Sequence, residues 1–306
     1  MNIKGKICQS GGKKTTKGRF INEDGLSTFN INYNEKTYKF IILMDGATGL
    51  GKDYEISKGK TSAEWYVEFM MLKIKEILSK NPTSNLEEVI ELAISKAINE
   101  INKYQNEKNI ILEEYAKPSA AIALLRSNGK TIDIFLLGDT ETIVAYKNGE
   151  VFKVDNPNKK ALQKLDTSVI HRMAEIAKER GCNVIDVMTD SEIQSMLQTN
   201  RAKKNANCED TYWVCGTTPG IAKYGTNISI NNNFIEGIIL ATDGFDYSML
   251  GLNPKEVYEL VKKYGIKYVS KAIRDEQERD SKCNKYPRFK KGDDLTAIYS
   301  ETNNRM

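Results

Sequence analysis

Apolar residues recur along the chain with two different periods, one typical of strands and one typical of helices. Residues 27–34 alternate, and residues 37–45 then become almost continuously apolar. Together the two runs predict a β-hairpin whose second strand is buried. That strand delivers Asp45 at its end.

Other stretches repeat their apolar residues at helical spacing. Residues 61–78 do so behind a capping-box pair, Thr61 and Glu64, and residues 84–101 carry a second regular stripe. Both stripes predict helices that pack on a core. Weaker helical patterns, one of which Gly181 would end, cover residues near 168–180, 189–203, 254–264 and 266–279.

Residues 119–154 predict antiparallel strands. Asn128-Gly129 and Asn148-Gly149 each stand between strand-like runs, and Asn-Gly favours the tight turns of hairpins. The stretch therefore predicts a β-meander of three or four strands. A further buried strand lies within 234–245, and a last one within 292–300.

Composition narrows the class of protein. The 306 residues carry 45 Lys and Arg against 41 Asp and Glu, a net charge of +4, which is too even to indicate nucleic-acid binding. The five cysteines are scattered, so we expect free thiols in a reducing compartment, the cytoplasm. No apolar run predicts a membrane span. The only histidine, His171, falls in a helical pattern, where we expect it at the surface or in packing.

No linker divides the chain, so we expect one domain over residues 1–306, with a variable, flap-like insertion at about 156–226.

A nucleotide-binding P-loop is one alternative for the glycine-rich segment after residue 45. Gly46, Gly51 and Lys52 match that motif, but Asp53 replaces its Ser or Thr. A P-loop also needs parallel strands joined by helices.

Four carboxylates share one kind of position. Asp45, Asp139, Asp243 and Asp293 each lie at a predicted strand end. Clustered carboxylates repel one another, and divalent cations that prefer oxygen ligands offset this repulsion. The pattern predicts a Mg²⁺ or Mn²⁺ site.

Five short motifs in order resemble one family. They are RFINEDG (19–25), MDGATG (44–49), LLGDTE (136–141), LATDGF (240–245) and GDDLT (292–296). In this order and spacing they are similar to the metal-dependent protein phosphatases, the bacterial type 2C serine/threonine phosphatases. The resemblance implies an α+β fold, in which two antiparallel sheets form a central sandwich flanked by pairs of antiparallel helices in four layers.

The resemblance also implies a reaction: metal-dependent hydrolysis of phosphoserine and phosphothreonine in proteins. A hydroxide that bridges two ions would attack phosphorus in line with the leaving oxygen. The expected cofactors are two Mn²⁺ or Mg²⁺ ions, with a third possible, and Arg19 would bind the phosphate. Asp45 would bridge two ions. The metal ligands that the resemblance implies are Glu23, Asp45, Gly46, Asp139, Asp243 and Asp293.

Three positions depart from the family pattern. Ala47 stands where some members carry a histidine that protonates the leaving group, and Glu141 replaces a usual arginine. Asp246 follows Asp243 by three residues, whereas the family residue follows by four. We assign no metal to Asp246, nor to Asp24 or Asp294.

The implied partners are a phosphorylated protein and a cognate serine/threonine kinase, without nucleic acid or membrane. The insertion would touch the substrate protein. An alternative function is a pseudophosphatase, which uses the same fold as a phosphoprotein-binding regulatory module. The presence of Glu23, Asp45, Asp243 and Asp293 favours activity.

Overall fold

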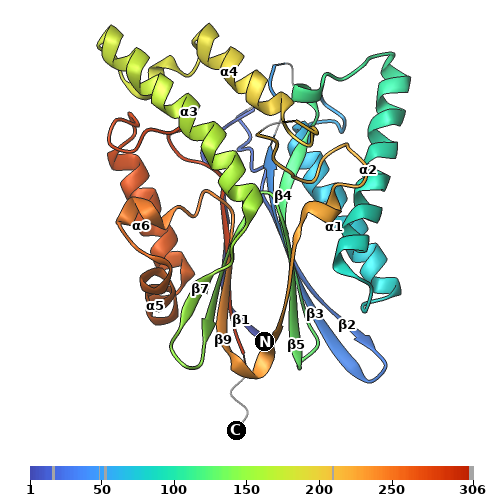
Figure 1. Ribbon diagram of the computed structural model, residues 1–306. Helices are drawn as coiled ribbons and strands as arrows, with labels where there is room; N and C mark the ends of the chain where they lie inside the picture. Colours follow the sequence, from blue (N-terminus) through green and yellow to red (C-terminus); the bar gives the residue numbers. More distant parts are fainter. Residues whose placement is uncertain (16–17, 48, 52–53, 209, 303–306) are drawn as a thin grey trace.

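Two antiparallel sheets face each other in the computed structural model, which describes residues 1–15, 18–47, 49–51, 54–208 and 210–302. Within these ranges each sheet has five strands (Figure 1). The first runs in the order β1 (Asn2–Gln9), β10 (Leu295–Glu301), β9 (Ile235–Ala241), β6 (Glu141–Tyr146), β7 (Val151–Lys153). The second runs β2 (Gly25–Tyr33), β3 (Lys36–Ala47), β4 (Ser119–Ser127), β5 (Thr131–Leu137), β8 (Thr226–Asn231).

Helices cover the outer faces of both sheets. α1 (Ser62–Lys80) and α2 (Leu86–Lys108) pack on the second sheet, and α5 (Pro254–Tyr264) and α6 (Ile266–Arg279) pack on the first. α3 (Pro157–Arg180) and α4 (Ser191–Ala202) lie at the end of the sandwich opposite the chain termini (Figure 1). The predicted α+β sandwich is confirmed. None of these described helices is both long and apolar enough to cross a membrane.

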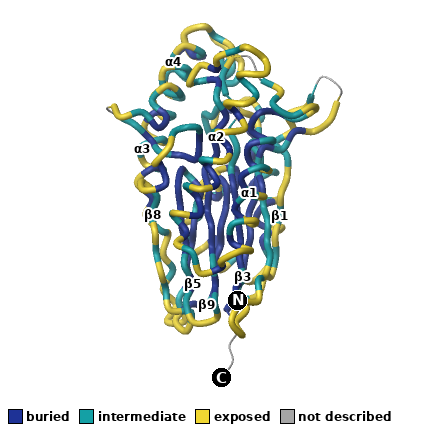
Figure 2. The backbone as a smooth tube through the Cα atoms, turned by 90° about the vertical axis from the view of Figure 1, so that its right-hand side faces the viewer, coloured by how far each residue is buried: buried dark blue, intermediate teal, exposed yellow. Residues whose placement is uncertain are grey.

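Residues 40–44 of strand β3 are apolar without interruption because both faces of the strand are buried there. Ile41 and Leu43 point into the core between the sheets, whereas Phe40, Ile42 and Met44 pack against α1 and α2. Successive side chains of a strand point to opposite faces, so a strand between two cores needs apolar residues at every position. Figure 2 shows the buried strands along the centre of the molecule.

The predicted start of α1 is confirmed in detail. The Thr61 hydroxyl accepts a hydrogen bond from the Glu64 N–H (3.1 Å), and the Glu64 carboxylate accepts one from the Thr61 N–H (2.8 Å). This capping box satisfies two helix-end donors. One turn later, the fully buried Tyr66 donates its hydroxyl to the Gly216 carbonyl at 2.9 Å and ties α1 to the segment before β8.

The continuous meander predicted for 119–154 is wrong. β4 and β5 pair in the second sheet, and β6 and β7 pair in the first, so the chain crosses between sheets at Gly138–Thr140. Gly138 has φ +98°, and a Cβ there would lie 2.4 Å from the Ala121 Cβ. The crossing therefore requires glycine at this position. The sequence shows the two hairpins but not the change of sheet between them.

Edge strands and helix starts account for the other differences. The sequence does not predict β1 and β8, because both are edge strands with largely exposed side chains and few apolar residues. α3 begins well before the predicted helical pattern, at Pro157, where Asn156 caps it. Gly181 ends α3 in the left-handed region, as expected.

We expect the substitution Ile90→Ala in α2 to lower the free energy of unfolding by about 2–5 kcal/mol, because it opens a cavity in the core. Ile90 is fully buried between α2 and the second sheet. Leu92→Ala, on the same helix at 53% exposure, is the matched control and should change the value by less than about 0.5 kcal/mol. Urea unfolding of both variants measures this. Equal effects would contradict this packing of α2.

Candidate metal centre

The predicted carboxylates meet in one pocket of about 340 Å³ beneath α3 and α4. Asp45 lies near the end of β3, Asp139 follows β5, Asp243 follows β9, and Asp293 precedes β10. Antiparallel strands with these directions bring the four residues to the same end of the sandwich, which is the upper end in Figure 1. Glu23 and Gly46 line the same pocket.

Two Asp-Gly pairs allow the backbone to approach closely around the pocket. The Gly46 N–H donates to the Glu23 carbonyl at 3.1 Å, and a Cβ at Gly46 would lie 2.3 Å from that oxygen. A Cβ at Gly244 would lie 1.9 Å from the Asp294 carbonyl. Only glycine fits at either place without a shift of the backbone. The glycines after Asp45 and Asp243 thus set the position of their neighbours.

Asp294 holds two segments of the N-terminal region in place. Its carboxylate accepts hydrogen bonds from the backbone N–H groups of Glu23 (2.6 Å) and Gly11 (2.7 Å). Bonds between a carboxylate and backbone N–H groups are among the stronger hydrogen bonds in proteins. The sequence assigns no metal to Asp294, and these contacts give it a role in positioning Glu23.

Repulsion and lost hydration dominate the electrostatics of the pocket. The pKa of Asp45 is raised by burial and then by the nearby charge of Asp243, whose N–H donates to Asp45 Oδ2 at 3.3 Å. The pKa of Asp243 is raised by the protein packed around it and then by Asp293, although Asp243 keeps contact with solvent. Burial also raises the pKa of Asp139. Burial and mutual repulsion thus disfavour the charged form of these groups, and a bound cation would offset both effects.

Asp24 is close to these carboxylates in the sequence motifs but does not line the pocket. Burial raises its pKa to about 7, and its carboxylate accepts a hydrogen bond from the Thr242 hydroxyl at 2.9 Å. The sequence assigns no metal to Asp24 either, and its position supports the strand end before Asp243.

The donor set suits a hard divalent cation. Its six members offer oxygen atoms alone, the ligands that Mg²⁺ and Mn²⁺ prefer. Within the described ranges, no three Asp, Glu, His or Cys side chains already stand in a geometry that could ligate one ion. The residues present fit such ions by chemistry, and ligation would require their side chains to move closer together.

Four cationic side chains approach these carboxylates. Lys13 Nζ lies 3.3 Å from Glu23 Oε1, and Lys290 Nζ lies 2.7 Å from Asp293 Oδ1. Lys159 on α3 binds Glu141 at 2.8 Å, and its charge lowers the pKa of Asp139 against the larger effect of burial. Arg201 on α4 lines the pocket and makes no side-chain hydrogen bond or ion pair with the described residues.

Arg19 lies elsewhere. Its guanidinium forms a two-pronged salt bridge with Glu64, at 2.6 and 2.8 Å, and donates to the Gly59 carbonyl at 2.7 Å. It is not among the residues that line the carboxylate pocket. Contact with phosphate would require this side chain to leave Glu64. The assignment of Arg19 to the phosphate stays a prediction.

The three departures from the family pattern have local explanations. Glu141 accepts from Lys153, Lys159 and the Tyr247 hydroxyl, so it joins α3 to the first sheet next to Asp139. Asp246 caps a short helical turn by accepting from the Ser248 N–H at 3.1 Å. Ala47 lines the pocket and offers it no titratable group. His171 is exposed on α3, as expected.

Helices α3 and α4 contribute residues that the sequence motifs do not indicate. Asp166 on α3 and Arg201 on α4 both line the pocket. Burial, followed by repulsion from Asp139, raises the pKa of Asp166 to about 7. Asp166 lies one turn from Leu162 and beside Leu165 on α3. A single carboxylate within an apolar helical stripe is the one feature of the sequence that could have indicated Asp166 as a pocket residue.

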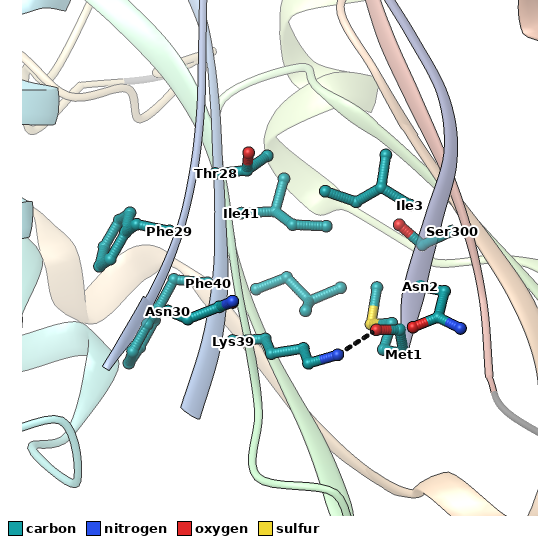
Figure 3. A pocket seen from close by; sticks show the side chains of 11 residues that line it. Met1, Asn2, Ile3, Thr28, Phe29, Asn30, Lys39, Phe40, Ile41 and Ser300 are labelled. Atoms are coloured by element: carbon teal, nitrogen blue, oxygen red, sulfur yellow. Dashed lines mark hydrogen bonds between the residues drawn. The ribbon is translucent and has the colours of Figure 1, made fainter. Parts of the chain in front are cut away.

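Two further hollows differ in how they relate to this pocket. One of about 530 Å³ adjoins it and shares Asp139, Asp243 and Asp293. Another of about 380 Å³ lies between β1 and the hairpin of β2 and β3 (Figure 3) and shares no lining residue with the carboxylate pocket. No acidic side chain lines it among the described residues, and its one lysine, Lys39, donates to the Met1 carbonyl at 2.8 Å. Its chemistry does not suit a catalytic site.

Comparison with known proteins identifies the family. The family model "Protein phosphatase 2C" matches residues 21–279. The chain belongs to the protein phosphatase 2C family. This phosphatase is accordingly a protein serine/threonine phosphatase. The matched stretch includes Glu23, Asp45, Asp139 and Asp243, whereas Arg19 and Asp293 lie outside it.

Solved bacterial structures share the fold of this phosphatase. Serine/threonine phosphatase Stp1 from Staphylococcus aureus is 15% identical, with a TM-score of 0.56 over 99% of this chain and 96% of that one. The S. agalactiae serine/threonine phosphatase is 12% identical (TM-score 0.53; 97% and 98% covered). PstP/Ppp from Mycobacterium tuberculosis is 9% identical (TM-score 0.51; 98% and 97% covered). A search of curated proteins finds no significant match.

We expect the metal-free phosphatase to lose stability as the pH rises from about 4.5 to 7. An aspartate in an unfolded chain has a pKa near 3.9, and burial raises that of Asp24 to about 7. A raised folded-state pKa contributes stability at low pH, and this contribution is lost as the pH passes through the folded-state value. Asp45, Asp139 and Asp243 act in the same direction.

Urea unfolding of the metal-stripped protein at several pH values measures this, and Mn²⁺ should restore stability near pH 7. Asp24→Asn cannot ionise and should flatten the profile. Stability that rises steadily with pH across this window would contradict the expectation.

Proposed function

We propose that this phosphatase hydrolyses phosphoserine and phosphothreonine in proteins with two divalent ions, Mn²⁺ or Mg²⁺, and a third held more weakly. The observation that carries the proposal is the convergence of all six predicted oxygen donors on one pocket. They are Glu23, Asp45, Gly46, Asp139, Asp243 and Asp293. Asp45 would serve both tightly held ions, and Asp139 with Asp243 would hold the third.

When bound, the ions would lower the pKa of a water molecule towards neutrality and neutralise negative charge on the phosphoryl group. The protein's part is to hold the donors in place. Asp294 fixes the backbone of Glu23, and the Asp243 N–H fixes the Asp45 carboxylate. Donors held by such contacts lose less freedom when they bind an ion.

The substrate phosphate also needs cations from the protein. We propose Arg19 for this role, because a guanidinium can give a phosphate two parallel hydrogen bonds. Arg19 would exchange Glu64 for the phosphate. Arg201, which has no described ion pair and lines the pocket, would face the same phosphate from the insertion. A phosphorylated protein, modified by a serine/threonine kinase, is the proposed substrate, and the proposed location is the cytoplasm.

A pseudophosphatase remains the alternative, with the pocket used to bind phosphoproteins. The completeness of the donor set favours hydrolysis. Neutralisation of any one donor would be the simplest route to an inactive relative, and none of the carboxylates is replaced.

The first test concerns Asp45. Hydrolysis of p-nitrophenyl phosphate by metal-stripped protein should appear only when Mn²⁺ or Mg²⁺ is added. Asp45→Asn keeps the shape of the side chain but removes its charge, so metal affinity, measured by calorimetry, should fall at least about tenfold. Activity at limiting metal should fall with it. Asp275→Asn, an exposed aspartate paired with Lys271 on α6, is the matched control. Full activity after metal removal would refute the metal requirement.

The second test separates the two roles of Arg19. If Arg19 binds phosphate, Arg19→Ala should raise the inhibition constant of inorganic phosphate about ten- to a hundredfold, because charge-assisted hydrogen bonds are worth about 1.5–3 kcal/mol. Glu64→Gln, which weakens the competing salt bridge, should leave this constant unchanged or lower it. Arg201→Ala shows how much the second guanidinium contributes.

A purely structural Arg19 gives a different result. Both Arg19→Ala and Glu64→Gln would then lower the melting temperature by loosening the start of α1, and neither would change inhibition by phosphate. That outcome would remove Arg19 from the proposed substrate-binding site.

A further inference from the structure

Lys290 places a fixed positive charge among the proposed metal ligands. Its Nζ lies 2.7 Å from Asp293 Oδ1. The same side chain lines both hollows that contain Asp139, Asp243 and Asp293. The amine of a lysine ordinarily carries a positive charge at neutral pH, so this contact is an ion pair.

The loop that carries Lys290 is held by its own hydrogen bonds. The buried Asp280 carboxylate accepts from the backbone N–H groups of Asn284, Lys285 and Tyr286 at 3.0 Å each. Arg288 donates to the same carboxylate at 2.6 Å. Loop residues before Lys290 are therefore fixed relative to α6, and Lys290 is delivered to the pocket by a defined backbone.

An ammonium group and a divalent ion compete for the same carboxylate oxygen. An ion bound by Asp293 through Oδ1 would replace the Lys290 contact. An ion bound through Oδ2 would leave that contact in place and lie near a group of like charge. Lys290 is 57% exposed, so water screens this repulsion and moderates its size. Lys13 makes a longer contact with Glu23, at 3.3 Å, at another ligand of the pocket.

We propose that Lys290 is a resident counter-ion of the metal centre, which competes with divalent ions at Asp293 and thereby sets the metal concentration at which the centre fills. It acts as a positioning residue for the ligands. The inference rests on the proposed function only in taking Asp293 as a metal ligand.

Calorimetric titration of Mn²⁺ into the full-length, metal-stripped protein tests this. Lys290→Met keeps much of the length of the side chain and removes its charge, so one Mn²⁺ should bind about tenfold more tightly, as expected for the loss of one screened like charge. Lys291→Met is the matched control, because Lys291 is exposed and does not line the pocket. Its affinity should equal that of the wild type.

A second variant and a second measurement show whether a change in Mn²⁺ affinity comes from the lost charge or from misfolding of Lys290→Met. Lys290→Arg keeps the charge and should bind Mn²⁺ like the wild type. In chelator at pH 7.5, Lys290→Met should melt at a lower temperature than the wild type, because the carboxylates lose their counter-ion, and it should gain more from Mn²⁺.

Two results would overturn the proposal. One is a folded Lys290→Met that binds Mn²⁺ no more tightly than the wild type, and the other is the failure of every variant to bind Mn²⁺. The titration measures binding and not hydrolysis, so a protein that binds Mn²⁺ as expected but removes no phosphate would contradict the proposed function and leave the role of Lys290 intact.

Discussion

The structure depends on how several carboxylates are held close together at one end of a β-sandwich. Their mutual repulsion opposes folding, and the large buried surface between the sheets and their helices is what can offset it. Glycines permit the approach: Gly46 and Gly244 let backbone carbonyls come nearer than any side chain would allow. Asp294 then fixes the N-terminal segment by two hydrogen bonds. The strand directions, the two glycines and the hydrogen bonds of Asp294 together hold the carboxylates close to one another.

The central part of the fold could be predicted from the sequence because its signals are local. The continuous apolar run of β3 reflects burial on both faces, and the capping box of α1 is a pattern of four residues. The path of the chain between sheets could not be predicted, since Gly138 marks a turn but does not say which strand comes next to β6. The edge strand β1 has too few buried residues to carry a pattern.

Some residues of the candidate site could likewise be predicted from the sequence, and others could not. The four aspartates lie at predicted strand ends and adjoin glycines, so Asp45 and Asp243 stand out from the sequence alone. The cations do not. Arg201 comes from α4, and only the fold brings it to the pocket, whereas Lys290 precedes Asp293 by three residues and belongs to no motif. Arg19 shows the converse: its motif is complete, yet its guanidinium is bound to Glu64.

The balance of charge in the pocket therefore depends on segments outside the family motifs. Glu141 stands where a family arginine is expected, and Lys159 of α3, which is bound to Glu141, restores a positive charge beside Asp139. One helix thus supplies a cation that a motif lacks. Because α3 also carries Asp166 into the pocket, segments outside the motifs contribute charges of both signs. In the proposed centre, the attraction for metal and phosphate would then depend on α3, α4 and the loop that carries Lys290 as well as on the proposed ligands.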